Sequence, residues 1–189
     1  MGVTGILLAA GQGSRLGGGK LLHKLASGDS IGITSYRNLC TALDHVLVVV
    51  RPNDAPLRDE FSRAGAVLID CADALQGQSH SLIAGVHATP AGHALVVALG
   101  DMPFVQVETI RALVRSIRSG ALIAAPYYLG SRGNPIAFAA HLRQELLLVS
   151  GDMGAREVVK RHAHELMKIN CADPGVLRDI DTPQDLAGS

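Results

Sequence analysis

Ile6-Leu7-Leu8-Ala9-Ala10-Gly11-Gln12-Gly13-Ser14-Arg15-Leu16-Gly17-Gly18-Gly19-Lys20 joins an apolar run to a glycine-rich segment that carries two cations. The apolar run is too short for a typical helix, and its ending at glycines is typical of a buried strand leading into a phosphate-binding loop. Glycine lets the backbone turn sharply and bring its N–H groups close to an anion. Arg15 and Lys20 would then neutralise phosphate oxygens. The stretch therefore predicts a nucleotide site.

The composition indicates an ordinary folded protein. The chain has 189 residues, of which 48% are hydrophobic and 18% charged, and its formal net charge is zero. This length suits a single domain over residues 1–189. The balanced charge gives no basic stripe for nucleic acid, and no apolar segment is long enough to span a bilayer. Because no secretion signal is recognisable at the N-terminus, we expect a cytoplasmic protein without nucleic-acid or membrane partners.

Short apolar runs alternate with helical patterns along the chain. Strands are expected at residues 3–10, 46–50, 67–69, 94–99, 122–125 and 166–169, and helices at 33–43, 56–64, 79–88, 107–119 and 155–164. This alternation predicts an α/β class protein with a three-layer, Rossmann-like fold and a mostly parallel sheet. Ligands of such folds bind beyond the carboxyl ends of the strands. The polar, glycine-containing segment 127–134 is expected to form an excursion over the site.

The glycine-rich loop differs from a Walker A motif. Gly19-Lys20 supplies the end of that motif, but Ser14 occupies its first glycine position and Leu21 replaces the hydroxyl that binds Mg²⁺. A P-loop NTPase is therefore disfavoured.

A dinucleotide-binding loop is a second alternative. Gly11 and Gly13 fit its Gly-x-Gly-x-x-Gly pattern, but Leu16 stands at the third glycine position. Arg51, at the end of the second expected strand, would be placed to meet the 2′-phosphate of NADP. An NADP-binding oxidoreductase thus remains a competing function.

A second signal is the run Val96-Val97-Ala98-Leu99-Gly100-Asp101-Met102-Pro103. It predicts a buried central strand with Asp101 at its carboxyl edge, where the glycine-rich loop also emerges. Gly100 allows close backbone approach. A carboxylate there suits Mg²⁺, which is held by one or two carboxylates together with phosphate oxygens. The alternative is a turn or helix-capping aspartate, and the neighbouring Gly/Arg/Lys loop favours the metal.

The C-terminal run Asp179-Ile180-Asp181-Thr182-Pro183-Gln184-Asp185-Leu186 contains further carboxylates. In an extended segment Asp179 and Asp181 lie on one face, and either would complete a metal site. Alternatively, Asp181 or Thr182 caps a last helix that begins at Pro183.

Five motifs in order resemble those of a known family. They are Leu8 to Lys20, Asp101-Met102-Pro103, Arg132-Gly133-Asn134-Pro135, Gly151-Asp152-Met153-Gly154-Ala155-Arg156 and Asp179 to Leu186. The chain resembles the MobA-like nucleotidyltransferases, and within them the molybdenum cofactor cytidylyltransferases. The resemblance implies a nucleotide-diphospho-sugar transferase-like fold. It also implies transfer of a nucleoside monophosphate from an NTP to a phosphate-bearing acceptor, with release of pyrophosphate.

The resemblance also implies roles for individual residues. Those expected to bind the nucleotide are Leu8, Ala9, Ala10, Gly11, Gly13, Ser14, Arg15, Lys20, Gly77 and Ser81. Those expected to bind the acceptor are Arg132, Gly133, Asn134, Asp152 and Arg156. Arg15, Lys20 and Asp101 are the expected catalytic residues, and Asp101 and Asp181 the expected ligands of Mg²⁺.

The choice of substrates is less constrained. Ala9-Ala10-Gly11 is typical of the cytidine branch and favours CTP, with molybdopterin as acceptor. Departures from the family pattern at 27–34 and 77–82 leave GTP open, as they do a sugar 1-phosphate acceptor. A molybdoenzyme or its chaperone is the candidate protein partner. A noncatalytic nucleotide- or cofactor-binding protein of molybdoenzyme maturation is the alternative from another class.

The expected chemistry needs no enzyme nucleophile or general base, because the attacking phosphate oxygen is already an anion. Catalysis then consists of alignment and charge neutralisation. Arg15 would stabilise the leaving pyrophosphate, and Lys20 would lie on the side of the α-phosphate. Asp101 would fix a metal ion that bridges phosphate oxygens.

Overall fold

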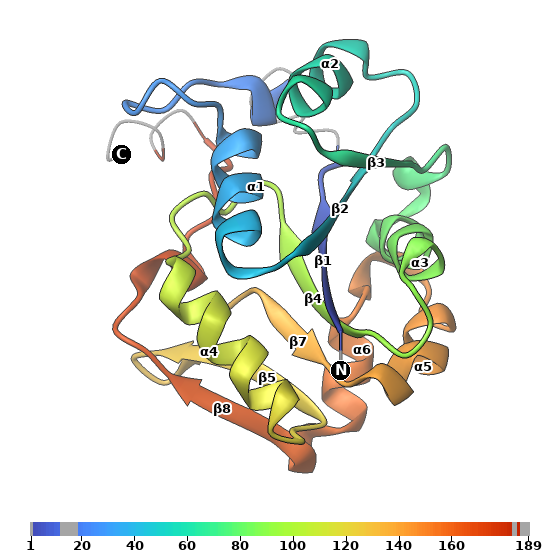
Figure 1. Cartoon of the computed structure of the whole chain (residues 1–189), viewed down its shortest axis with the longest axis vertical. Coiled ribbons are helices and arrows are strands. Elements are labelled where there is room, and N and C mark those ends of the chain that lie inside the picture. The colour runs from blue at the N-terminus through green and yellow to red at the C-terminus, as the bar shows by residue number, and fades with distance from the viewer. Residues whose placement is uncertain (1, 12–18, 183–184, 186–189) are drawn as a thin grey trace.

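The computed structural model describes residues 2–11, 19–182 and 185, and an eight-stranded sheet forms its centre (Figure 1). The strands are β1 (Val3–Leu8), β2 (His45–Val50), β3 (Val67–Asp70), β4 (Ala94–Leu99), β5 (Ile123–Tyr128), β6 (Ser131–Arg132), β7 (Ile136–Phe138) and β8 (Leu166–Asn170). The α-helices are α1 (Ile31–Ala42), α2 (Ala55–Arg63), α3 (Gln78–Ala88), α4 (Val107–Arg118), α5 (Arg143–Leu147) and α6 (Arg156–Arg161).

The strand order is β3-β2-β1-β4-β7-β5-β6, with β8 paired to β5. Strands β1 to β4 pair in parallel, as do β5 and β8, so the predicted mostly parallel sheet is confirmed. Strand β7 pairs antiparallel with both β4 and β5. The sequence did not predict β7, because its three residues are too few to show a strand period.

Helices cover both faces of the sheet. Leu7 of β1 and Val96 of β4 pack into the core on the side of α1, α2 and α4. Ile6 and Val97, their neighbours in sequence, pack into the core on the side of α3, α5 and α6. Alternate residues of a strand point to opposite faces, so both faces of these strands are buried. The expected three-layer α/β fold is confirmed.

Helix α4 buries the apolar face that its sequence predicts. Ile110, Leu113, Val114 and Ile117 are each at most 4% exposed. Burying side chains of this size contributes about 1.5–3 kcal/mol each to folding, so α4 is firmly fixed to the sheet. Ser119 is the C-cap of the helix, and Gly120 directly after it has a φ of 99°, a left-handed conformation that commonly ends a helix.

Several predicted boundaries are corrected. Strand β1 ends at Leu8 rather than Ala10, and α6 ends at Arg161 rather than His164. Helix α1 begins at Ile31 and not at Ile33, because the buried Ser30 is its N-cap and accepts a hydrogen bond from the Ile33 amide.

The predicted excursion over 127–134 is mainly a hairpin between β5 and β6. Tyr127 pairs with Arg132, and Tyr128 with Ser131. Leu129 and Gly130 form the turn, and both have positive φ, 48° and 81°. This is the backbone pattern of a tight hairpin turn whose twist matches the strands. Within the described residues, no helix combines the length and apolar character needed to cross a bilayer.

Candidate active site

The site lies at the carboxyl edge of three neighbouring parallel strands. Leu8, near the end of β1, aligns with Val49 of β2 and Leu99 of β4. The chain beyond each strand is tied to its neighbour, since the Ala9 amide donates to the Val49 carbonyl and the Gly100 amide to the Leu8 carbonyl. The segments that follow β1 and β4 therefore leave the sheet side by side, as the two motifs predicted.

Gly100 permits this close approach. A Cβ atom at this position would lie 3.1 Å from the Leu8 carbonyl oxygen and 3.1 Å from Cδ1 of Leu21. A side chain at residue 100 would therefore push β1 and the Leu21 segment away from β4. The prediction that Gly100 allows close approach of the backbone is therefore confirmed.

At this edge Lys20 forms hydrogen bonds with two carboxylates that are far from it in the sequence. It begins a short 3₁₀ turn, Lys20–Leu22, after Gly19 in the left-handed conformation. Its Nζ donates to Oδ2 of Asp101 at 2.7 Å and to Oδ1 of Asp181 at 2.7 Å. The Lys20 side chain is 11% exposed. We call Lys20, Asp101 and Asp181 the catalytic cluster, after the catalytic and metal-binding roles predicted for them from the sequence.

The electrostatics of the cluster keep Lys20 charged. Burial by itself lowers the pKa of Lys20, but the hydrogen-bonded carboxylates of Asp101 and Asp181 outweigh burial and raise it above its ordinary value. The ammonium group neutralises only one of the two carboxylates, so these three groups retain one negative charge.

The carboxylates of the cluster fit a divalent metal ion. Oδ1 of Asp101 is buried and has no hydrogen-bond partner among the described residues. An unpaired buried carboxylate oxygen is costly unless a ligand satisfies it. Within the described part of the chain, no group of three or more His, Cys, Asp or Glu side chains is arranged so that it could hold a metal ion. A metal ion here would therefore take two carboxylates, with phosphate oxygens and water completing its shell, as Mg²⁺ often does.

The C-terminal segment reaches the cluster through specific anchors. The Ile180 amide donates to the Asp101 carbonyl at 2.9 Å, and Ile180 is fully buried. Asp179 is exposed, whereas Asp181 joins the cluster. The extended backbone around Ile180 therefore brings Asp181, and not Asp179, to Lys20.

A second anchor, not predicted from the sequence, is Asp173. Its buried carboxylate accepts hydrogen bonds from the Gln106 amide and the Thr109 hydroxyl at the start of α4, and from the Gly175 amide. It satisfies donors at the helix N-terminus and fixes the course of the chain that leads to Asp181.

The sequence offers Asp181 or Thr182 as the cap of a last helix. In the described residues the accepting side chain is instead that of Asp185. The carboxylate of Asp185 accepts from the amides of Asp181 and Thr182 and from the Thr182 hydroxyl. These hydrogen bonds, those from Thr182 above all, lower the pKa of Asp185. Pro183, proposed as the start of a last helix, lies outside the described residues.

A cavity of about 310 Å³ adjoins the cluster. It is lined by Leu8, Ala10, Gly11, Ala74, Leu75, Gly77, Gln78, Ser81, Leu99, Asp101 and Asp152. Five of the ten predicted nucleotide-binding residues line this space, namely Leu8, Ala10, Gly11, Gly77 and Ser81, and after that prediction we call it the nucleotide cavity. Ala9 is buried and does not line this cavity. Gly13, Ser14 and Arg15 lie outside the described residues.

Gly77 shapes the wall of the nucleotide cavity. Its φ is 134°, and a Cβ atom there would lie 2.8 Å from the Gly151 carbonyl oxygen. Only glycine fits such a contact without a shift of the backbone. Next to Gly77, Asp152 lines the nucleotide cavity, although the sequence placed it among the acceptor residues.

The remaining predicted acceptor residues lie further along the edge of the sheet. Asn134 and Arg156 line one small cavity together with Gln78 and Leu99. Gly133 is buried, and a Cβ there would lie 2.3 Å from the Val176 carbonyl oxygen, so its role is close packing. Arg132 lies in a different hollow, which it shares with Arg156.

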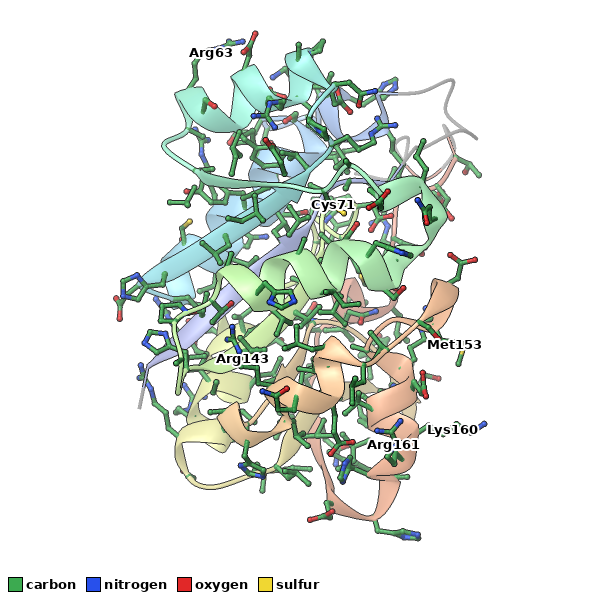
Figure 2. All side chains as sticks on the ribbon, turned by 90° about the vertical axis from the view of Figure 1, so that its right-hand side faces the viewer. Arg63, Cys71, Arg143, Met153, Lys160 and Arg161 are labelled. Carbon is green, nitrogen blue, oxygen red and sulfur yellow. The ribbon has the colours of Figure 1, made fainter. Side chains whose placement is uncertain are left out.

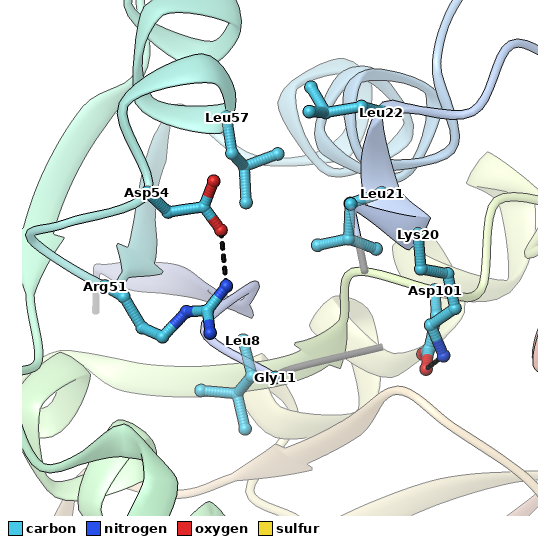
Figure 3. A pocket seen from close by; sticks show the side chains of 10 residues that line it. Leu8, Gly11, Lys20, Leu21, Leu22, Arg51, Asp54, Leu57 and Asp101 are labelled. Atoms are coloured by element: carbon cyan, nitrogen blue, oxygen red, sulfur yellow. Dashed lines mark hydrogen bonds and ion pairs between the residues drawn. The ribbon is translucent and has the colours of Figure 1, made fainter. Parts of the chain in front are cut away.

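A pocket of about 80 Å³ lies on the other side of the cluster, between β1, β2 and α2. Figure 3 shows Arg51 and Asp54 facing each other in it, with Lys20 beside Asp101. Arg51 donates to Asp54 at 2.6 Å, but its buried Nε has no partner among the described residues. The sequence indicated Arg51 only as a residue that would meet the 2′-phosphate of NADP if the protein bound a dinucleotide.

The fold is that of an α/β protein with a mostly parallel sheet, and in such folds ligands bind at the carboxyl edge, where the cluster lies. Residues 5–166 match the family model of the MobA-like NTP transferase domain, and the chain belongs to this family. The family predicted from the five motifs is therefore confirmed.

Three relatives of nearly equal length show the range of the family. The purine catabolism protein PucB of Bacillus subtilis is 33% identical over 97% of this chain and 93% of its own. Nicotine blue oxidoreductase of Paenarthrobacter nicotinovorans is 31% identical over 97% of this chain and 94% of its own. A molybdenum cofactor guanylyltransferase of Mesorhizobium japonicum is 30% identical over 98% and 93%.

Solved structures confirm the predicted nucleotide-diphospho-sugar transferase-like fold. Rv0371c of Mycobacterium tuberculosis superposes with a TM-score of 0.86 at 23% identity, covering 100% of this chain and 97% of its own. A complex of Rv0371c with manganese superposes with a TM-score of 0.79 at 21% identity, covering 100% and 97%. A nucleotidyl transferase of Methanothermobacter gives a TM-score of 0.83 at 21% identity, covering 98% and 94%.

Proposed function

We propose that this protein transfers a nucleoside monophosphate from an NTP, CTP in the first place, to a phosphate-bearing acceptor of the molybdopterin type. An acceptor phosphate oxygen attacks the α-phosphorus, the bond between that phosphorus and the bridging oxygen breaks, and pyrophosphate leaves. The catalytic cluster carries this proposal, since it sets a lysine and two carboxylates beside the nucleotide cavity.

Asp101 and Asp181 would hold the metal ion, which we propose to be Mg²⁺. A bound divalent ion supplies positive charge to the phosphate oxygens during transfer. The unsatisfied Oδ1 of Asp101 supports this assignment, because a metal ion would compensate it. Both carboxylates enter the site from ordered backbone, held by β4 and by the Ile180 anchor.

Lys20 would act on the α-phosphate. Its raised pKa keeps it an ammonium ion at neutral pH, so it can stabilise negative charge and does not accept a proton. With Asp101 and Asp181 holding a metal ion, Lys20 would be free to contact the phosphate. Arg15 would stabilise the leaving pyrophosphate. Each such cation, fixed before the reaction, is worth on the order of a few kcal/mol in the transition state.

The nucleotide cavity would receive the base and ribose. Gln78 and Ser81 offer polar groups there, beside the backbone of Ala10 and Gly11. The Ala9-Ala10-Gly11 sequence favours CTP, and the relative named as a molybdenum cofactor guanylyltransferase supports a molybdopterin-type acceptor. Asn134 and Arg156, in the adjacent small cavity, are placed to bind the attacking phosphate.

A thermal-shift and activity panel tests the proposal. CTP, GTP, ATP and NADPH are each added with and without Mg²⁺, and pyrophosphate release is then measured with molybdopterin as acceptor. A ligand that binds only the folded state raises the melting temperature according to its affinity. We expect Mg²⁺-dependent stabilisation by CTP and acceptor-dependent pyrophosphate release. No stabilisation by any NTP would contradict the proposal.

Matched variants sharpen this panel. Lys20→Ala is expected to lose turnover, whereas Lys24→Ala is expected to keep it. Lys24 is a suitable control because it is also paired with a carboxylate, Glu60 at 2.7 Å, but its side chain is 60% exposed. NTP binding without pyrophosphate release would instead support a noncatalytic partner of molybdoenzyme maturation.

A second candidate function is oxidoreduction with a nicotinamide dinucleotide. One relative is named nicotine blue oxidoreductase. In addition, the buried Nε of Arg51, directly after β2, is a hydrogen-bond donor without a partner among the described residues. The Asp54 carboxylate beside Arg51 counts against a phosphate there, because it would repel one. Stabilisation by NADPH alone would favour this second function.

A further inference from the structure

Four cations surround one hollow at the far end of the sheet. Arg132 comes from β6, Arg156 and Lys160 from α6, and Lys168 from β8. The hollow has a volume of about 440 Å³, and its other lining residues are Tyr127, Met153, Val159, Ala163 and Leu166. We call it the basic groove. Its lining contains no acidic side chain.

The cations of the basic groove lack ion pairs within the described residues, although the chain as a whole has zero net charge. Arg161, which follows Lys160 in the sequence, differs from it in being ion-paired. Arg161 bonds to Glu145 at 2.7 Å and to Glu157 at 3.2 Å. Consecutive helical residues point about 100° apart, and Figure 2 shows Lys160 and Arg161 leaving α6 in different directions.

Unpaired like charges around one hollow repel each other, and an anion placed among them relieves that repulsion. The groove also has a firm floor, because Val159 is 1% exposed. Lys168 Nζ lies 5.3 Å from the centre of the Tyr127 ring, a cation–π distance that restricts the lysine. Positive charge is therefore concentrated over a preformed surface.

The basic groove is linked to the candidate active site by shared lining residues. Arg156 lines both the groove and the small cavity that contains Asn134 and Gln78. That cavity in turn shares Gln78, Leu8 and Leu99 with the nucleotide cavity. A molecule whose phosphate lies at Arg156 can therefore extend into the basic groove.

We propose that the basic groove binds a second anionic group of the acceptor, separate from the phosphate that attacks the nucleotide. This inference rests on the proposed function, because it defines the acceptor as a small molecule with at least two anionic groups. Arg156 lies between the two subsites and contacts the part of the acceptor that joins them. Lys160 and Lys168 recognise the distal group.

Inorganic phosphate and butane-1,4-bisphosphonate are the probes that test this inference. Each is titrated into the whole protein at constant ionic strength, and amide NMR signals of residues 156–168 locate the binding. Linking two anions makes the second contact intramolecular, so we expect the bisphosphonate to bind at least tenfold more tightly than phosphate. Equal affinity of the two probes, or no shift of these signals, would overturn the inference.

Two double variants of equal charge change provide the control. Lys160→Gln/Lys168→Gln is expected to abolish the tenfold gain. Arg115→Gln/Arg118→Gln, which removes two exposed cations from α4, is expected to preserve it. Equal loss in both would overturn the inference, because it would show that total charge alone is sensed. Unchanged melting temperatures would confirm that all variants fold.

Two further measurements distinguish a failure of this inference from a failure of the proposed NTP transfer, and a small anionic ligand from an acidic peptide. In Lys20→Ala the groove signals should still shift, so groove binding can hold even if NTP transfer fails. A hexaglutamate peptide should bind more weakly than the bisphosphonate. Tighter binding of the peptide would overturn the inference in favour of an acidic protein segment.

Discussion

Lys20 Nζ lies 2.7 Å from Oδ2 of Asp101, a residue 81 positions further along the chain. The contact joins the glycine-rich segment after β1 to the loop after β4. It exists because the two strands pair in parallel and end together. The same nitrogen also holds Asp181, so a single cation ties three distant segments into one site.

Replacing Lys20 by alanine should destabilise the protein in the absence of metal. The substitution leaves two neighbouring carboxylates without their shared donor, and hydrogen bonds to charged groups contribute about 1.5–3 kcal/mol each. We expect urea unfolding to show a loss of about 1–3 kcal/mol, which Mg²⁺ largely restores by replacing the ammonium charge. Lys24→Ala should show neither the loss nor the rescue. If Mg²⁺ does not rescue Lys20→Ala, the carboxylates are not its ligands.

Gly77→Ala should weaken both folding and nucleotide binding. The new Cβ would meet the Gly151 carbonyl at 2.8 Å with φ at 134°, a conformation that is strained for alanine. Such strain costs on the order of 1–3 kcal/mol. Gly65→Ala is the matched control, since Gly65 also has positive φ, 78°, but no atom within 4 Å of the added Cβ. Chemical denaturation and CTP titration of both variants measure the difference, and equal effects would contradict the assigned contact.

The ion pair between His162 and Glu145 should make stability depend on pH. Hydrogen bonds to Glu165 and Glu145 raise the pKa of His162 above 6.5, so its contribution is complete below about that pH and is lost as pH rises through the raised value. Hydrogen bonds from Arg161 and His162 lower the pKa of Glu145 below 4.5, so its contribution is lost only in acid. The pair therefore stabilises the fold most between these two values.

A double comparison measures that effect. His162→Gln should reduce the free energy of unfolding by about 0.2–1 kcal/mol at pH 5.5, as partly exposed pairs do, and by less at pH 9. His164→Gln should change little at either pH, because His164 is exposed and has no side-chain partner among the described residues. A loss for His162→Gln that grows with pH would contradict the ion pair.

Much of the fold could be predicted because its central strands, such as β1 and β4, are buried on both faces. Runs such as Ala94–Leu99 are apolar at every position, and the helices between them carry one-sided apolar periods. Strand β7 could not be predicted, because its place depends on pairing with β4 and β5 rather than on its own three residues.

The candidate site could be predicted in outline only. Parallel pairing made the meeting of Lys20 and Asp101 predictable, since both follow strands at one edge. The choice of Asp181 over Asp179 depends on the Ile180 anchor, a tertiary contact that leaves no pattern in sequence. The basic groove is likewise assembled from β6, α6 and β8, whose cations are scattered along the chain.

Asp101 and Asp181 are proposed to bind the metal ion that holds an NTP beside Lys20. Calorimetric titration of CTP with Mg²⁺ into the wild type, Asp101→Asn and Asp179→Asn tests this claim most directly. Asp179→Asn removes an exposed carboxylate two residues from Asp181 and is the matched control. We predict metal-dependent binding in the wild type and in Asp179→Asn, and a loss of at least tenfold in affinity in Asp101→Asn. Equal, metal-independent binding by all three proteins would contradict the claim.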